Sequence, residues 1–170
     1  PGLNSDIRSI CMGEDINLCA ADGGTYHWMD SWTNPYGNSA CINVKPTQNT
    51  TYKVTVTANG CSSSDNVIVL VNPIPVAIAN IYGDPIICAG ESTTLVPGAG
   101  ADDYQWSEFL PVPNATVKPT VTTTYRITVT RKGCTATDDV QVTVIPLPDI
   151  KVTANPENIC SGAQSILVAS

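Results

Sequence analysis

The sequence predicts an all-β protein of two small sandwiches in tandem, followed by the start of a third. One observation is a long internal repeat: TTYKVTVTANGCSSSDNVIVLVNPIP at 50–75 returns as TTYRITVTRKGCTATDDVQVTVIPLP at 123–148. The other is composition, because the chain is rich in Thr and Val, which favour strands, and in Gly, Pro and Asn, which favour turns. A repeat of this length divides the 170 residues into structural units.

Further matches set the expected boundaries of these units. ICMGEDINL at 10–18 resembles ICAGESTTL at 87–95, and a third copy begins with NICSGAQSILVAS at 158–170. Since the chain starts with proline, we expect a mature or excised segment. The predicted domains are repeat 1 over 1–73 with an incomplete first strand, repeat 2 over 74–146, and the truncated start of repeat 3 over 147–170.

Alternating apolar and polar residues predict a hairpin at the end of each repeat. In repeat 2, Tyr125, Ile127 and Val129 are expected to face inward, and the turn signal RKGC then leads into a second strand. The stretches 92–98, 103–109 and 114–120 predict three more strands. Six or seven short strands in about 75 residues, around a central tryptophan, are typical of a small immunoglobulin-like sandwich.

Trp28 and Trp106 are the candidate core tryptophans. They occupy matching positions in the motifs YHW and YQW, which favours a shared structural role in the core over a ligand platform.

Seven cysteines predict disulfides in an oxidising compartment, because close CxxC pairs and His at metal spacing are absent from the sequence. The pairing is inferred from equivalent positions in the two repeats, together with two cysteines that occur only in repeat 1. The predicted bridges are Cys11–Cys61, Cys88–Cys134 and Cys19–Cys41, with Cys160 unpaired within this chain.

Prolines in the connections NPIP and IPLP predict stiff junctions. Pro73, Pro75, Pro146 and Pro148 favour extended backbone, and no Gly/Ser linker separates the repeats. We therefore expect an elongated rod in which each repeat adds about 35–40 Å.

Charge and hydropathy exclude two classes of partner. A net charge of −7 without a basic cluster opposes binding to nucleic acid. The longest apolar runs, such as 67–71, are too short for membrane insertion. The predicted partners are neighbouring repeats, with a surface polysaccharide or lateral self-association into fibres as further options.

The motifs ICAGESTTL, YQWS and TTTYRITVTRKGCTATDDVQVTVIPLP resemble the PKD-like and Ig-like tandem repeats of Bacteroidetes surface proteins. The resemblance covers nearly the whole chain. It implies a spacer or adhesive stalk in a secreted or cell-surface protein, including adhesins linked to gliding and cargo of the type IX secretion route. Repeat 1 departs from the pattern in its extra cysteine pair and in WMDSWTNPYGNSAC at 28–41.

Trp32 and Tyr36 lie in this departure and, with Tyr26 and His27 nearby, form a speculative ligand patch. Exposed aromatic rings stack on sugars, so carbohydrate binding is one interpretation of the patch, although no polar group is placed convincingly beside the rings. The alternatives are that these rings cover the Cys19–Cys41 bridge or pack against a neighbouring chain.

Acidic pairs are the candidate calcium ligands, at 102–103 and 138–139. Calcium requires six or more oxygens in a defined loop, so solvated surface charge is the preferred interpretation of Asp102, Asp103, Asp138 and Asp139. No other cofactor is expected.

The sequence offers no catalytic residue. A hydrolytic triad needs a histidine, and the single one, His27, lies beside Trp28 without a nucleophile motif. The preferred function is a structural stalk or filament-building segment outside the cell. The alternative is a carbohydrate- or surface-binding module with its site in repeat 1, and strand exchange between chain ends is a further route to a fibre.

Overall fold

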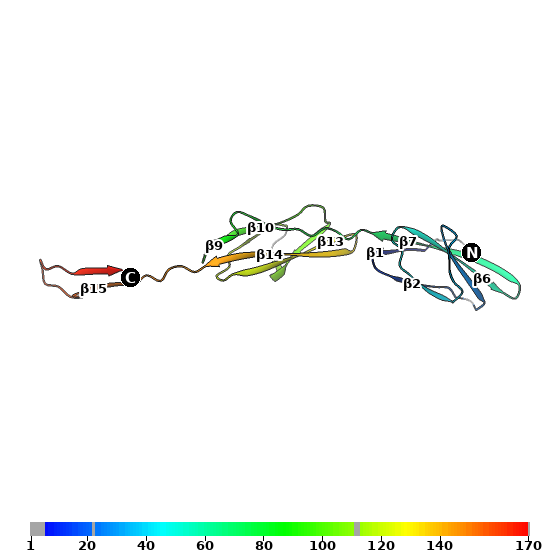
Figure 1. Ribbon diagram of the computed structural model, residues 1–170, viewed down its shortest axis with the longest axis horizontal. Helices are drawn as coiled ribbons and strands as arrows, with labels where there is room; N and C mark the ends of the chain where they lie inside the picture. The colour runs from blue at the N-terminus through cyan, green and yellow to red at the C-terminus, as the bar shows by residue number, and fades with distance from the viewer. Residues whose placement is uncertain (1–5, 22, 111–112, 170) are drawn as a thin grey trace.

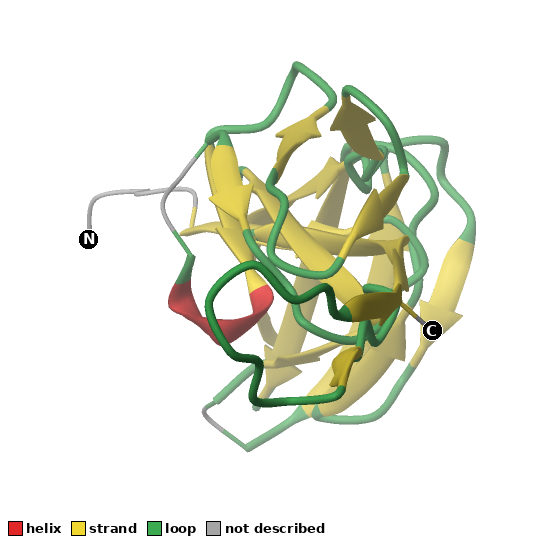
Figure 2. Cartoon of the chain, turned by 90° about the vertical axis from the view of Figure 1, so that its left-hand side faces the viewer, coloured by secondary structure: helices red, strands yellow, loops and turns green. Residues whose placement is uncertain are grey.

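The computed structural model describes residues 6–21, 23–110 and 113–169. Two β-sandwiches follow one another along a single axis, and a two-stranded hairpin lies beyond the second one (Figure 1). Seen end-on, the strands of both sandwiches superpose in projection (Figure 2). The expected incomplete first strand of repeat 1 concerns residues 1–5, which lie outside the described residues.

The first sandwich consists of a five-stranded sheet, in the order β1–β7–β6–β3–β4, and a two-stranded sheet of β2 and β5. Its strands are β1 (Asp6–Cys11), β2 (Ile16–Cys19), β3 (Thr25–Asp30), β4 (Pro35–Gly37), β5 (Cys41–Val44), β6 (Thr50–Ala58) and β7 (Cys61–Asn72). The pairing of β1 with β7 is parallel, whereas β6 and β7 form the predicted antiparallel hairpin.

The second sandwich repeats this plan with a four-stranded sheet, β11–β13–β14–β9, and a three-stranded sheet, β12–β10–β8. Its strands are β8 (Ala79–Tyr82), β9 (Ile86–Cys88), β10 (Thr93–Pro97), β11 (Asp103–Trp106), β12 (Ala115–Val117), β13 (Thr123–Arg131) and β14 (Cys134–Ile145). Here β9 takes the place of β1 and pairs in parallel with β14.

A third hairpin, β15 (Val152–Asn155) with β16 (Ile166–Ala169), reproduces the pairing of β8 with β10. Leu167 lies opposite Ala154, as Leu95 lies opposite Ile81. Leu95 is fully buried, but Leu167 is 71% exposed because no second sheet covers it within the described residues.

Each sandwich has its own hydrophobic core. Tyr125, Ile127 and Val129 are all buried, which confirms the predicted alternation of the strand. Trp28 and Trp106 are buried as well, and each indole N–H donates to a backbone carbonyl, of Ser39 at 3.0 Å and of Pro113 at 2.9 Å. Each tryptophan ring is therefore buried with its N–H hydrogen-bonded, Trp28 in the core of the first sandwich and Trp106 in the core of the second.

The strand predicted at 103–109 is shorter than expected. It ends at Trp106 and continues as a 3₁₀ turn over Ser107–Phe109, in which Glu108 has a positive φ of 61°. A residue in this left-handed region cannot continue a strand. The turn redirects the chain toward β12.

The burial difference between equivalent leucines is testable. Leu95→Ala should cost about 2–5 kcal/mol of unfolding free energy, because it opens a cavity in a packed core. Leu167→Ala is the matched control and should change the unfolding free energy by less than about 0.5 kcal/mol. Urea unfolding of both variants checks this, and equal effects would contradict the separate cores described above.

Candidate functional site at the junction between the sandwiches

A disulfide joins the two sandwiches. Cys11, at the end of β1, is bonded to Cys134, at the start of β14, with 5.6 Å between their Cα atoms and a sequence separation of 123. The predicted pairs Cys11–Cys61 and Cys88–Cys134 are therefore wrong. Cys11 is equivalent to Cys88, and Cys61 to Cys134, as the repeat indicates. The disulfide, however, joins the first cysteine of repeat 1 to the second cysteine of repeat 2.

The length of the last strand explains this correction. Cys11 pairs with Asn72, whereas Cys61 is the first residue of the twelve-residue strand β7. Eleven steps of about 3.3 Å place the two ends of that strand about 36 Å apart, and a disulfide requires Cα atoms within about 7 Å. The same argument separates Cys88, opposite Ile145, from Cys134.

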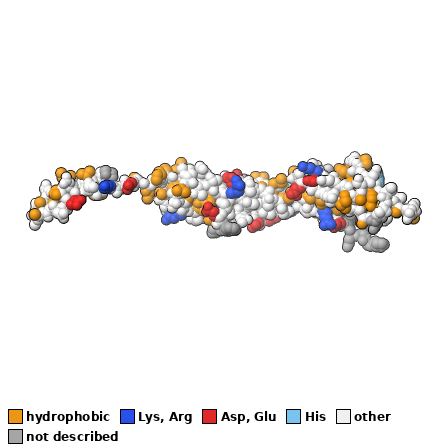
Figure 3. Space-filling view, turned by 90° about the horizontal axis from the view of Figure 1, so that it is seen from below, with side chains coloured by type: hydrophobic (Ala, Val, Ile, Leu, Met, Phe, Trp, Pro, Cys, Tyr) orange, Lys and Arg blue, Asp and Glu red, His pale blue; other side chains and the backbone are white. Residues whose placement is uncertain are grey.

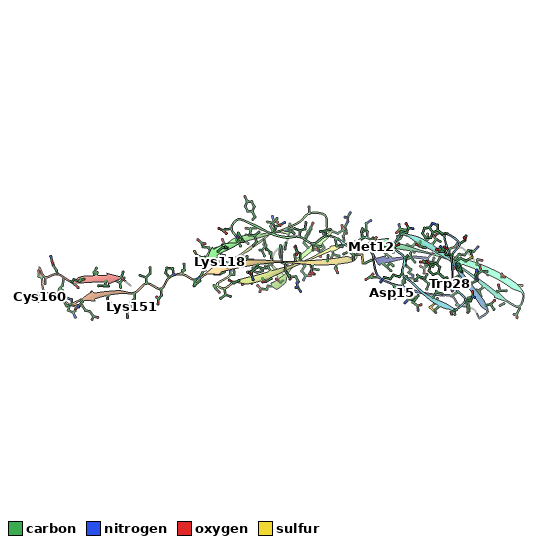
Figure 4. The ribbon with its side chains drawn as sticks, viewed as in Figure 1. Met12, Asp15, Trp28, Lys118, Lys151 and Cys160 are labelled. Carbon is green, nitrogen blue, oxygen red and sulfur yellow. A yellow bond between two sulfur atoms is a disulfide. The ribbon has the colours of Figure 1, made fainter. Side chains whose placement is uncertain are left out.

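Asn72 ties the junction together beside the disulfide. Its side-chain amide donates to the hydroxyl of Ser9 at 2.7 Å and to the backbone carbonyl of Lys132, in the turn of the second sandwich, at 3.2 Å. Its own carbonyl accepts the N–H of Met12 at 2.8 Å. Figure 4 places Met12 where the two sandwiches meet. The junction thus combines a covalent bond with directional hydrogen bonds.

The expected Cys19–Cys41 bridge is present and lies within the first sandwich. The two cysteines are directly opposite one another on the antiparallel strands β2 and β5, with Cα atoms 4.1 Å apart. This bridge closes a short loop and holds the two-stranded sheet together. Repeat 2 lacks both cysteines, and its corresponding sheet has a third strand, β8.

Among the described residues, three cysteines have no disulfide partner: Cys61, Cys88 and Cys160. All three are exposed. Cys61 opens β7 at the outer end of the first sandwich, and Cys88 ends β9 at the far end of the second (Figure 1). Cys160 lies at the tip of the third hairpin (Figure 4).

The four residues of the speculative ligand patch do not share one face. Tyr26 and His27 are neighbours on β3, so their side chains point to opposite faces of the sheet. Tyr26 packs against the core, while the His27 ring lies 3.2 Å from the side chain of Asn38. Tyr36 packs edge-on against the buried ring of Tyr52, with centroids 5.1 Å apart.

Trp32 is the one exposed tryptophan, at 52%. It lies in the turn after β3, where Asp30 organises the backbone. The buried carboxylate of Asp30 accepts hydrogen bonds of 2.8 Å from the N–H of Trp32, the N–H of Asn34 and the side-chain amide of Asn34. Burial acts to raise the pKa of Asp30, but these hydrogen bonds outweigh it and hold the pKa below its ordinary value.

Three of the four carboxylates of the acidic pairs, those of Asp102, Asp138 and Asp139, accept hydrogen bonds from the protein itself. Asp139 accepts two hydrogen bonds of 2.7 Å from the guanidinium of Arg126, which hold the pKa of Asp139 below its ordinary value. Asp138 accepts the N–H of Ala79, and Asp102 accepts the N–H of Lys132. No group of three or more His, Cys, Asp or Glu residues in the described part of the chain could hold a metal ion.

Among the hollows in the described part of the chain, two lie away from the patch residues. The larger, of about 1000 Å³, opens in the first sandwich beside β7 and includes Leu18, Trp28 and Val56 in its lining. The smaller, of about 550 Å³, lies beside the turn that follows Cys88 and includes Gly90 and Glu91. Neither is lined by any of the four patch residues.

The described residues include no helix that is long and apolar enough to span a membrane.

No protein-family model and no curated protein matches the sequence. Solved structures with a similar fold contain immunoglobulin-like domains in tandem. Extracellular domains 3–5 of Drosophila OTK align with a TM-score of 0.52 and 14% identity, covering 84% of this chain and 61% of that one. The chain therefore spans less than two thirds of that fragment.

Two further matches have lower TM-scores. The titin I-band fragment I67–I69 aligns at 0.47 and 10% identity, over 95% of this chain and 79% of that one. The insect immune protein hemolin, described as having implications for homophilic adhesion, aligns at 0.44 and 14% identity, over 85% and 46%. Together with the OTK fragment, the sheet topology shows two immunoglobulin-like sandwiches in tandem. Disulfide-bonded domains of this kind are typical of an extracellular location.

The Asp30 turn predicts a specific pH dependence. A carboxyl group whose folded pKa is lowered stabilises the fold above its unfolded pKa, near 3.8, and this contribution is lost as the pH falls further. Asp30→Asn should therefore lower the urea midpoint at neutral pH and flatten its decline below pH 4. Asp149→Asn, at an exposed position between the second sandwich and the third hairpin, is the control. An unchanged acid profile in Asp30→Asn would contradict the assignment.

Proposed function

We propose that this chain is a stalk segment of an extracellular, cell-surface bacterial protein of the adhesin type. The observation that carries the proposal is the disulfide between Cys11 and Cys134, which crosses from one sandwich to the next. Interfaces between domains of one chain ordinarily leave relative motion free. A covalent bond at the junction opposes such motion and favours a rod of fixed direction.

The position of the bridge gives it a mechanical role. Tension along the chain enters through β1, crosses the disulfide to Cys134, and leaves through β14. Everything between Cys11 and Cys134 is closed into a loop that lies outside this covalent path. Most strands of both sandwiches are therefore shielded from extension even if they unfold.

The surface also supports a spacer role. Charged side chains are few and scattered along the rod, and most of the surface in view is uncharged (Figure 3). The small polar side chains Thr and Ser on the outer faces of β6, β7, β13 and β14 keep such a surface hydrated. The resemblance to repeats of Bacteroidetes surface proteins supports the same role and adds lateral association into filaments as a proposal.

Single-molecule stretching between the chain ends tests the stalk. With the bridge intact, unfolding of the sandwiches should not add the contour length of the loop between Cys11 and Cys134, whose sequence separation is 123. The double variant Cys11→Ser/Cys134→Ser keeps the Cys19–Cys41 bridge, which holds 22 of the 123 residues closed, so 123 − 22 = 101 residues are released. This should add about 350 Å of contour length, at about 3.3–3.6 Å per residue. Cys61, Cys88 and Cys160 are replaced by serine in all samples to prevent disulfide exchange.

Cys19→Ser/Cys41→Ser is the matched control for this measurement. The Cys19–Cys41 bridge lies inside the loop closed by Cys11 and Cys134. Removing the Cys19–Cys41 bridge should therefore leave the released contour length unchanged while Cys11–Cys134 is intact. Equal released lengths with and without Cys11–Cys134 would contradict the proposed load path.

A second candidate function is recognition of a surface polysaccharide through Trp32, supported by the 52% exposure of its side chain on the ordered Asp30 turn. Because Trp28 and Trp106 are buried, iodide should quench mainly the fluorescence of Trp32. A polysaccharide that binds there should protect Trp32 against quenching, and Trp32→Ala should abolish retention of the protein on that polysaccharide. Unchanged quenching with surface polysaccharides would leave the stalk as the function.

A further inference from the structure

Cys11 is the strand-end half of the Cys11–Cys134 bridge, and the turn that begins at Cys11 recurs at Cys88 and at Cys160. In each case the cysteine opens a turn that includes a glycine of positive φ: Gly13 at 91°, Gly90 at 92° and Gly162 at 84°. The turn is closed by a backbone hydrogen bond of 3.0 Å to the cysteine carbonyl, from Glu14, Glu91 and Ala163 in turn. Cys88 and Cys160 thus lie in the same backbone setting as the bonded Cys11.

The match between Cys11 and Cys88 extends to side chains and neighbours. The N–H of Cys11 donates to the carboxylate of Glu14 at 2.8 Å, and the N–H of Cys88 donates to that of Glu91 at 2.9 Å. The residue after Cys11 donates to the carbonyl of Asn72, as the residue after Cys88 does to that of Ile145. The local structure that presents Cys11 to its partner is therefore already formed around Cys88.

The turn half of the bridge occurs twice, before Cys61 and before Cys134. Both hairpins have two central residues of positive φ, Asn59 at 53° and Gly60 at 80° in one, Lys132 at 49° and Gly133 at 81° in the other. These values match a type I′ turn, which fixes where the next residue points. Cys61 is consequently presented as Cys134 is, but no strand-end cysteine meets it in the described chain.

The two unused halves are complementary and lie at opposite ends of the pair of sandwiches. Cys61 is a turn half at the outer end of the first sandwich, and Cys88 is a strand-end half at the far end of the second (Figure 1). Both thiols are exposed. A further repeat of the same architecture at either end would supply the missing partner in the geometry that the internal bridge already shows.

We infer that Cys61 and Cys88 are sites of inter-repeat disulfides, in which the strand-end cysteine of one repeat bonds to the turn cysteine of the next. Cys88 takes the turn cysteine of a following repeat, and Cys61 takes the strand-end cysteine of a preceding one. This inference deepens the proposed stalk function and rests on it, since it makes every junction of the rod covalent.

The bond forms by thiol–disulfide exchange with a small disulfide such as oxidised glutathione. The thiolate of one cysteine attacks a glutathione sulfur, which gives a mixed disulfide and one glutathione thiolate. The second cysteine thiolate then attacks the protein sulfur of the mixed disulfide and releases the other glutathione. Two protein thiols are oxidised to a disulfide, one oxidised glutathione is reduced to two thiols, and the two protons go to solvent or to the released thiolates.

Two variants of the full chain test the inference, each with one half of the bridge. Cys61→Ser/Cys160→Ser keeps Cys88, and Cys88→Ser/Cys160→Ser keeps Cys61; both retain Cys11–Cys134 and Cys19–Cys41. They are mixed in equal amounts in a buffer of reduced and oxidised glutathione. We expect heterodimers at several times the sum of both homodimers, with non-reducing peptide mapping showing a Cys88–Cys61 linkage between the two chains.

Random oxidation of exposed thiols would instead make heterodimers only half of all dimers. That fraction, or a predominance of Cys61–Cys61 or Cys88–Cys88 links, would overturn the inference, as would the absence of any dimer. Circular dichroism and mapping of the two internal bridges verify that both variants are folded. Because the stretching experiment depends on Cys11–Cys134 alone, failure of the mixed-variant test leaves its outcome, and the stalk function, unaffected.

Discussion

A parallel strand pair in each sandwich, β1 with β7 and β9 with β14, determines how the repeats are connected. In both sandwiches the last strand has twelve residues, begins at the turn cysteine, and ends beside the strand-end cysteine. The two cysteines of one repeat are thus held about 36 Å apart by the rigid sheet itself. A bond between them is impossible in the folded state, and the turn of the neighbouring repeat is the partner within reach.

The cores and the junction have separate physical roles. Each sandwich buries its own tryptophan and its own inward face of the hairpin, and the two core clusters share no residue. Apolar burial therefore stabilises each unit but does little to orient one against the other. Orientation depends instead on the bridge and on Asn72, whose amide joins the first sandwich to the turn of the second.

The alternation of residues and the repeat sufficed to predict the sandwiches, the buried tryptophans and the inward face of 125–129. They did not suffice for the cysteines, because a repeat shows which positions are equivalent and not whether a bond stays within a unit. The signal was nevertheless in the sequence: twelve residues from Cys61 to Asn72 form one uninterrupted strand, which is too long for an intra-repeat bond. Likewise, adjacent positions on one strand already place Tyr26 and His27 on opposite faces.

Successive bridges of the proposed register would interlock. The loop closed by Cys11 and Cys134 contains Cys88, so a bond from Cys88 to a following repeat opens a second loop before the first has closed. Force arriving at Cys134 then has two covalent routes onward, forward along β14 or back through the second sandwich to Cys88. The forward route to Cys160 spans 160 − 134 = 26 residues, and the route back to Cys88 spans 134 − 88 = 46 residues. At about 3.5 Å per residue, these routes would limit extension to about 90 Å and about 160 Å. The overlapping loops of the proposed bridges would thus limit extension at every repeat, including one whose sandwich has unfolded.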